Sequence, residues 1–332
     1  MTNQTLMSDL KNALARIHYW FKKNYPAKIA SLASGLSPLK IDNVLSSLSF
    51  QVSKEVSELY QWSNGYLIDK CTDDWIFDYM FLLSLESGVK EAQSWVEEHE
   101  EIALMYKYAG KPILPICMSD IEFLAVVATD DEQATSPVIS ISEFVDISLR
   151  YTNLTAMMLT LAESYETGGL FISRKDYIEK DEKKYAAAYR KYNSGITDLA
   201  LERFLKIFPE DFSWQTVELL HNDLYMSNSY GIEIPLSSLK TKVVNTLLNL
   251  LQDEKYDSSF SVVLVLEELR AVDALIQGLQ HPSKWVRSRA AFALGKIKAF
   301  EAVEFVSQLL ADPDPMVQEA VKEALEMFRN QR

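Results

Sequence analysis

Residues 272–297 read VDALIQGLQHPSKWVRSRAAFALGKI, and residues 303–328 read VEFVSQLLADPDPMVQEAVKEALEMF. Placing Pro282 on Pro313 aligns the two segments at a constant offset of 31 residues, from 282 to 313. Self-similarity at this period is typical of a helical solenoid, in which each repeat buries its apolar face by stacking on the next one. We therefore predict two repeats, at 271–301 and 302–332. Apolar or small residues coincide in them at Leu275 and Val306, Leu279 and Leu310, Val286 and Val317, Ala290 and Val321, Ala293 and Ala324, and Leu294 and Leu325.

Each repeat has the pattern of two helices with a short break between them. Asp312-Pro313 is expected to end one helix, because proline cannot continue it, and small residues such as Ala290 and Ala324 let neighbouring helices approach closely. The pair WVRSRAAFALGKI and DPDPMVQEAVKEAL resembles HEAT repeats, of the short type found in phycobilin-lyase-like proteins. Upstream, Val262, Val265 and Leu266 stand at equivalent positions of a degenerate third repeat. We expect a HEAT-like α-solenoid over residues 197–332.

The first half of the chain has a different apolar pattern. Helical spacing is found at 3–23, 53–64, 88–108 and 152–165, whereas short β-branched or aromatic runs lie at 66–68, 75–83, 113–117, 123–128 and 138–141. This order predicts an α+β domain over residues 1–169, with a mainly antiparallel sheet and flanking helices. A charged, tyrosine-rich segment at 170–196 is expected to be a helical connector.

Four short motifs carry a second resemblance. They are ELYQWSNG at 58–65, FLLSLES at 81–87, LPI at 114–116 and PVISISEF at 137–144. In this order they are similar to the SMI1/KNR4, or SUKH, superfamily. Bacterial members of that superfamily are mostly immunity proteins, which bind and neutralise toxins that are often nucleases. The resemblance implies the same role for this chain.

The net charge of −14 is concentrated in the first half of the chain, where residues 1–165 hold 22 acidic and 12 basic residues. Such a field repels nucleic acid and anionic membranes and attracts basic partners. Alternatively, the acidity only maintains solubility. If the charge serves binding, the expected contact residues lie on or beside predicted loops. They are Asp73, Asp74, Asp78, Asp130, Asp131 and Glu132.

Trp285 and Arg287 are further candidates for contact with a partner, since both residue types are enriched at interface hot spots. A structural interpretation is also open. In that case Trp285 packs between repeats, and Arg287 pairs with acidic side chains of the next repeat. We favour the structural interpretation.

We find no pattern that predicts catalysis. No two of the four histidines have the spacing of metal ligands, and the chain contains no GxSxG, CxxC, GxxxxGK[ST] or GxGxxG. Cys71 and Cys117 lie in apolar surroundings, as expected of buried free thiols in a reducing compartment. We expect no catalytic, cofactor or metal site, and the lack of a signal-like or membrane-spanning stretch predicts a soluble cytoplasmic protein.

Together these features predict a non-enzymatic protein-interaction module. The most specific hypothesis is an immunity protein that neutralises a basic, nuclease-type toxin through its acidic surface, with neither nucleic acid nor a membrane as a partner. Two alternatives remain open. One is a regulatory scaffold of the Smi1/Knr4 type, and the other is a chaperone or lyase-like factor for a tetrapyrrole-bearing protein.

Overall fold

The protein divides into two compact units in the computed structural model. Unit 1 comprises Met1–Ile196 with Tyr230–Ile232, and unit 2 comprises Thr197–Ser229 with Glu233–Arg332. Each unit has its own buried apolar core. The structure describes residues 8–66, 77, 79–98, 111–142, 147–173, 177–207, 214–252 and 259–330.

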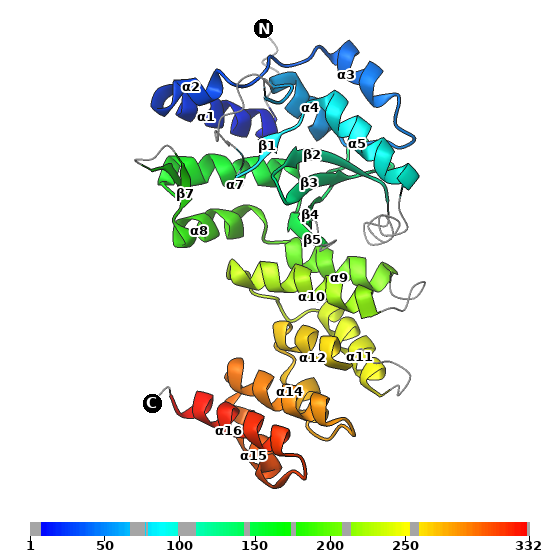
Figure 1. The fold of residues 1–332 in the computed structure, drawn as a ribbon, viewed down its shortest axis with the longest axis vertical. Helices are drawn as coiled ribbons and strands as arrows, with labels where there is room; N and C mark the ends of the chain where they lie inside the picture. The colour runs from blue at the N-terminus through cyan, green and yellow to red at the C-terminus, as the bar shows by residue number, and fades with distance from the viewer. Residues whose placement is uncertain are drawn as a thin grey trace. The chain divides into compact units, whose positions relative to one another are not determined.

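Unit 1 is organised around a five-stranded antiparallel sheet, in which each strand pairs with the next one along the chain (Figure 1). The strands in order are β1 (Phe81–Leu82), β2 (Ile113–Met118), β3 (Glu122–Val127), β4 (Val138–Ser142) and β5 (Ile147–Tyr151). β2 carries an almost unbroken apolar run, ILPICM, and its first five residues are buried. Such a run is expected of a strand covered on both faces.

Helices supply that cover. In unit 1 they are α1 (Asp9–Asn24), α2 (Pro26–Ile29), α3 (Pro38–Leu45), α4 (Lys54–Trp62), α5 (Leu85–Glu98), α7 (Leu154–Thr167) and α8 (Glu182–Tyr192). α5 packs on β2, and α1 packs on α7. The rings of Phe21 and Tyr165 meet edge to face there, with centroids 4.8 Å apart. Gly88 allows α5 to lie close to the sheet, because a Cβ at this position would stand 2.4 Å from the carbonyl oxygen of Pro115.

The prediction of a helical connector at 170–196 is wrong for the first part of this segment. Gly168 takes a left-handed conformation (φ 75°) that ends α7 and reverses the chain. A small antiparallel hairpin follows, formed by β6 (Leu170–Ile172) and β7 (Ile178–Lys180). Helix resumes only at α8, where Tyr185 and Tyr189 are buried. Tyr177 is exposed and directly precedes β7, so it lies outside this helix.

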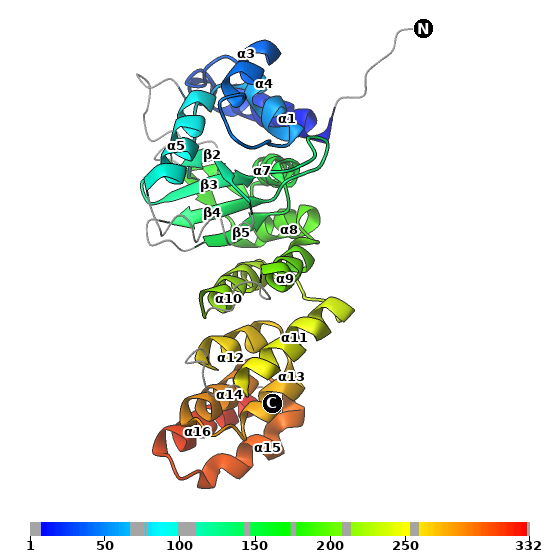
Figure 2. The ribbon, with the colours of Figure 1, turned by 90° about the vertical axis from the view of Figure 1, so that its right-hand side faces the viewer.

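Unit 2 is entirely helical in the residues that the structure describes. Its helices are α9 (Ile196–Ile207), α10 (Trp214–Ser229), α11 (Ser238–Leu251), α12 (Ser259–Glu268), α13 (Val272–Gly278), α14 (Lys284–Lys296), α15 (Val303–Gln308) and α16 (Pro315–Arg329), with short 3₁₀ turns η2 (Phe300–Ala302) and η3 (Leu309–Ala311). The second helices of successive pairs, α10, α12, α14 and α16, pack against one another in that order (Figure 2). This is the stacking expected of a solenoid.

The predicted fold class is confirmed: an α+β region with an antiparallel sheet is followed by an all-helical region. In unit 2 most of the positions aligned by the 31-residue offset lie in the core, and Val286, Ala290, Leu294 and Val317 are fully buried, whereas 45% of Leu310 is exposed. On α12, the equivalent residues Val262, Val265 and Leu266 are also fully buried.

Candidate protein-binding surfaces

Three of the predicted acidic contact residues, Asp130, Asp131 and Glu132, lie side by side on the loop between β3 and β4, and all three are exposed. The loop is shaped by its own side chains. The Thr129 hydroxyl accepts a hydrogen bond from the Asp131 N–H (3.2 Å), and Asp131 Oδ1 accepts one from the Gln133 N–H (2.9 Å). These are the local turns that Thr and Asp favour. We call residues 129–135 the acidic loop.

The acidic loop is also fastened to the segment that leads into α4. The Thr129 N–H donates to the Gln51 carbonyl (3.0 Å), and the Lys54 N–H donates to the Glu132 carbonyl (2.9 Å). Lys111 forms an ion pair with Asp130 and neutralises part of the local charge. The loop therefore presents its carboxylates from a backbone anchored at Thr129 and at Glu132. The other three acidic candidates, Asp73, Asp74 and Asp78, lie outside the described residues.

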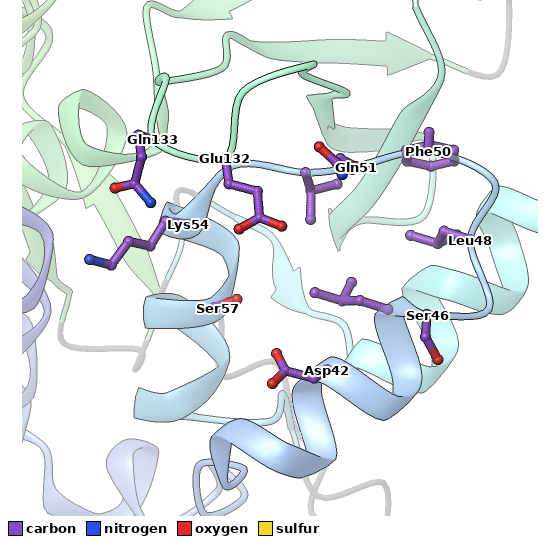
Figure 3. Close-up of a pocket in the computed structure, with 11 residues that line it drawn as sticks. Asp42, Ser46, Leu48, Phe50, Gln51, Lys54, Ser57, Glu132 and Gln133 are labelled. Carbon is purple, nitrogen blue, oxygen red and sulfur yellow. The ribbon is translucent and has the colours of Figure 1, made fainter.

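A cavity of about 580 Å³ opens beside the acidic loop, between α3 and α4. Its wall is apolar at Leu45, Leu48 and Val52. Figure 3 shows the side chains of Glu132, from the loop, and Asp42, from α3, directed toward the same space, whereas that of Lys54 extends away from it. This mixture of apolar wall and carboxylates suits an amphipathic, basic segment of a protein partner.

Arg287 occupies a structural position in unit 2. Its guanidinium group makes two hydrogen bonds to the Asp312 carboxylate, at 2.8 Å from Nε and 3.0 Å from Nη2, and donates to the carbonyls of His281 and Pro282. Asp312 belongs to the following repeat. The guanidinium lowers the pKa of the Asp312 carboxyl, mainly through these hydrogen bonds. Arg287 thus joins consecutive repeats, as the structural interpretation predicts.

The corresponding prediction for Trp285 is wrong, because 59% of this residue is exposed rather than packed between repeats. Val286, the next residue, takes the buried position at the start of α14. The ammonium group of Lys284 lies 5.6 Å from the indole ring and pairs with Asp314 at 3.0 Å. Trp285 is therefore available to a partner.

Replacing Arg287 with an uncharged residue should show how the contribution of the Arg287–Asp312 ion pair to stability depends on pH. The pKa of Asp312 is lowered in the folded state, so the stabilisation is present above the ordinary aspartate pKa and is lost as pH falls through the lowered value. We expect Arg287→Gln to cost about 3 kcal/mol near pH 7 and clearly less at pH 3. Thermal melts of both proteins at the two pH values measure this. An equal difference in stability between the two proteins at both pH values would contradict a stabilising Arg287–Asp312 ion pair.

A second charged cluster in unit 2 was not predicted from the sequence. Glu267 on α12 is buried and pairs at 2.5 Å with both Arg289 and Lys296 of α14. Nearby on the same stack, His221 Nε2 lies 3.9 Å from the Glu268 carboxylate, and burial lowers the pKa of this histidine. The only sequence signal was a glutamate pair at the end of the apolar run in α12. This cluster fastens α12 to α14 electrostatically.

Among the described residues, the structure contains no group of three or more His, Cys, Asp or Glu side chains that could hold a metal ion. No helix in the described part of the chain is long and apolar enough to cross a membrane.

No curated protein matches the chain. The likeness to the SMI1/KNR4 superfamily therefore stays a prediction. Residues 272–332 match the family of HEAT repeats, so this region of the chain is a HEAT-like repeat structure of the kind that serves protein interaction.

Proposed function

We propose that the chain is a non-enzymatic binding protein that neutralises a basic, nuclease-type toxin by covering its phosphate-binding groove. The observation that carries this proposal is the acidic loop. Its three neighbouring carboxylates are held on an anchored backbone beside a cavity whose wall is partly apolar. A pre-organised acidic surface loses little conformational entropy on binding and speeds association with a basic partner.

Two further features support the proposal. The first 165 residues carry most of the net negative charge of the chain, with 22 acidic and 12 basic residues. The toxin-neutralising role itself follows from the resemblance of four sequence motifs to the SMI1/KNR4 superfamily. In this reading, the HEAT-like region of unit 2 supports the binding domain or contacts a second surface of the same partner.

A regulatory scaffold is the second candidate, and the HEAT-like match favours it. Exposed Trp285 on α14 and Phe305 on α15 give unit 2 its own aromatic side chains for contact with a partner. A scaffold would recruit cellular proteins by packing of these residues, with little dependence on salt. The toxin proposal requires a basic protein whose binding weakens with salt.

Affinity capture followed by an activity assay separates the two candidates. The full chain is used as bait in host extract at about 50 mM and about 500 mM salt, concentrations at which a charge-driven complex should be retained and released respectively. We expect a basic nuclease that elutes with salt and is inhibited by the purified chain. Capture of salt-resistant, non-nuclease proteins alone would support the scaffold and refute the toxin proposal.

Charge reversal on the acidic loop should slow association with the captured nuclease. We select Asp130→Lys with Glu132→Lys and keep Asp131, because Asp131 forms the turn through the Gln133 N–H. At low salt the association rate should fall by about tenfold or more, while the dissociation rate changes little. Stopped-flow or surface-based kinetics over a salt series measures both rates.

The matched control places the same charge change elsewhere on unit 1. Glu179 on β7 and Glu182 on α8 are both exposed, and Glu179→Lys with Glu182→Lys alters the net charge by the same amount. We expect a much smaller change in association rate for this control. Equal rates for the loop variant and wild type, in folded proteins, would refute the role of the acidic loop.

A further inference from the structure

We propose that a second cavity in unit 1, floored by Glu55 and Glu58, binds the guanidinium group of an arginine side chain on the protein partner. The inference rests on the proposed function, since it names the group that a basic partner would insert beside the acidic loop. It is carried by the burial, hydrogen bonds and charge of the cavity itself.

The cavity has a volume of about 390 Å³ and lies where the first turns of α1, α4 and α7 meet the acidic loop. It is adjacent to the larger cavity, and Lys54, Glu132 and Gln133 line both of them. Its charge is strongly unbalanced. Four carboxylates line it, from Asp9, Glu55, Glu58 and Glu132, against the single ammonium group of Lys54.

The two glutamates on the floor are nearly removed from solvent, with 9% of Glu55 and 8% of Glu58 exposed. They lie three residues apart on α4 and therefore on one helical face. No ion pair involves either of them among the residues that the structure describes. Two like charges buried together without a cation are unfavourable, and a bound cation would relieve this.

Each glutamate already has a structural task, but that task uses one oxygen. Glu55 Oε1 accepts from the N–H (2.9 Å) and the hydroxyl (2.5 Å) of Thr155, and so caps the start of α7. Glu58 Oε2 accepts from the Ser8 hydroxyl (2.5 Å). The second carboxylate oxygen of Glu55, Oε2, is buried and has no hydrogen-bond partner. Helix capping therefore does not account for this acceptor.

Guanidinium is the cation that fits this arrangement best. Its planar fork offers five N–H donors, so one group can reach acceptors on two carboxylates one helical turn apart. The cavity is also lined by Leu10 and Ala134, against which the alkyl stem of an arginine side chain can pack. An ammonium group directs its donors from a single point and is more strongly hydrated, so a lysine side chain should bind less well.

Lys54 should oppose this binding. Its side chain lines the rim of the cavity, is exposed, and in Figure 3 extends away from the neighbouring cavity. An incoming cation would meet its positive charge. Removing that charge leaves the glutamates in place, so a neutral residue at this position should strengthen binding, whereas any loss of Glu55 charge should weaken it.

The test uses the full chain and N-acetyl-arginine methylamide as the probe, with binding followed by NMR chemical shifts. We expect saturable binding to the wild type, and about tenfold weaker binding of the citrulline analogue, which lacks the charge. The acetyl-lysine analogue should also bind less tightly. Equal binding of the arginine, lysine and citrulline probes, or no binding of any, would overturn the proposal.

Two variants and a control assign the probe to the cavity. Glu55→Gln keeps the acceptor for Thr155 and removes the charge, and should weaken arginine binding about tenfold. Lys54→Gln should strengthen it, which a variant that had merely lost its fold could not do. Asp120→Asn removes an exposed carboxylate that does not line the cavity, and should leave binding unchanged. Equal affinities for all four proteins would refute the site.

The same variants distinguish failure of this site from failure of the proposed function. With the captured nuclease, Glu55→Gln should accelerate dissociation and leave the association rate almost unchanged, unlike the acidic-loop variant. If the arginine probe binds at Glu55 but no basic partner exists, the toxin proposal fails and the site stands. If a basic nuclease is neutralised equally well by Glu55→Gln, the toxin proposal stands and its partner does not use this site.

Discussion

Leu294→Asp is expected to unfold the helical stack of unit 2 at room temperature. Leu294 lies on α14, is fully buried, and belongs to the helix that packs on both α12 and α16. The substitution removes a buried leucine and places a carboxylate among apolar side chains. The lost burial costs about 2–5 kcal/mol, and the buried charge costs more unless the carboxylate is protonated. The total is comparable to the whole stability of a small domain.

Far-UV circular dichroism and limited proteolysis of the full chain measure this loss. Unit 1 should retain its fold, so protease-sensitive sites should appear within unit 2 and the helical signal should fall only in part. Leu310→Asp is the matched control. It makes the same chemical change on η3, where 45% of the leucine is exposed, and should cost less than about 1 kcal/mol. A wild-type melt for Leu294→Asp would contradict the alignment of the repeats.

The core of unit 2 was predictable because repetition makes the pattern redundant. The 31-residue offset places Val286 on Val317 and Ala290 on Val321, and all four are fully buried. Two aligned copies of one helix pair identify the buried positions more narrowly than the periodicity of a single helix does. In unit 1, β2, β3 and β4 coincide with predicted short apolar runs between turn residues. β5 (Ile147–Tyr151) is not among the predicted runs, because buried and half-buried residues alternate along it.

Other features depend on contacts between residues that are distant in the sequence. The hairpin is held by backbone pairing of Leu170–Ile172 with Ile178–Lys180, whereas the charged, tyrosine-rich composition of this segment predicts a helix. Glu55 and Glu58 fall within the helix predicted at 53–64, and nothing in that pattern marks them as buried. Both are buried, and their hydrogen-bond partners Thr155 and Ser8 lie 100 and 50 positions away in the sequence. Periodicity along one helix cannot reveal such a partner, so the proposed arginine site cannot be found from the sequence pattern.

Gly295→Val is expected to separate α14 from α16 and to destabilise unit 2 by about 3 kcal/mol or more. A Cβ on Gly295 would stand 2.6 Å from the Cα and 2.8 Å from the Cβ of Ala324. The obstacle is helix backbone, which cannot rotate away as a side chain can. Replacing a helical glycine with a better helix former ordinarily gains up to about 1 kcal/mol. Valine gains only part of this, so the steric cost should exceed it.

Comparison with a second glycine isolates the steric cause. Gly195 lies in the turn before α9, and a Cβ there would meet nothing within 4 Å. Gly195→Val should therefore change the melting temperature little, whereas Gly295→Val should lower it by roughly 10 °C, the shift expected when a domain of this size loses about 3 kcal/mol. Ala324→Gly on the Gly295→Val background removes the opposing Cβ but leaves the Cα. It should consequently restore only a small part of the loss. Full recovery would show that side-chain crowding, and not the approach of the two helix backbones, sets the spacing of the repeats.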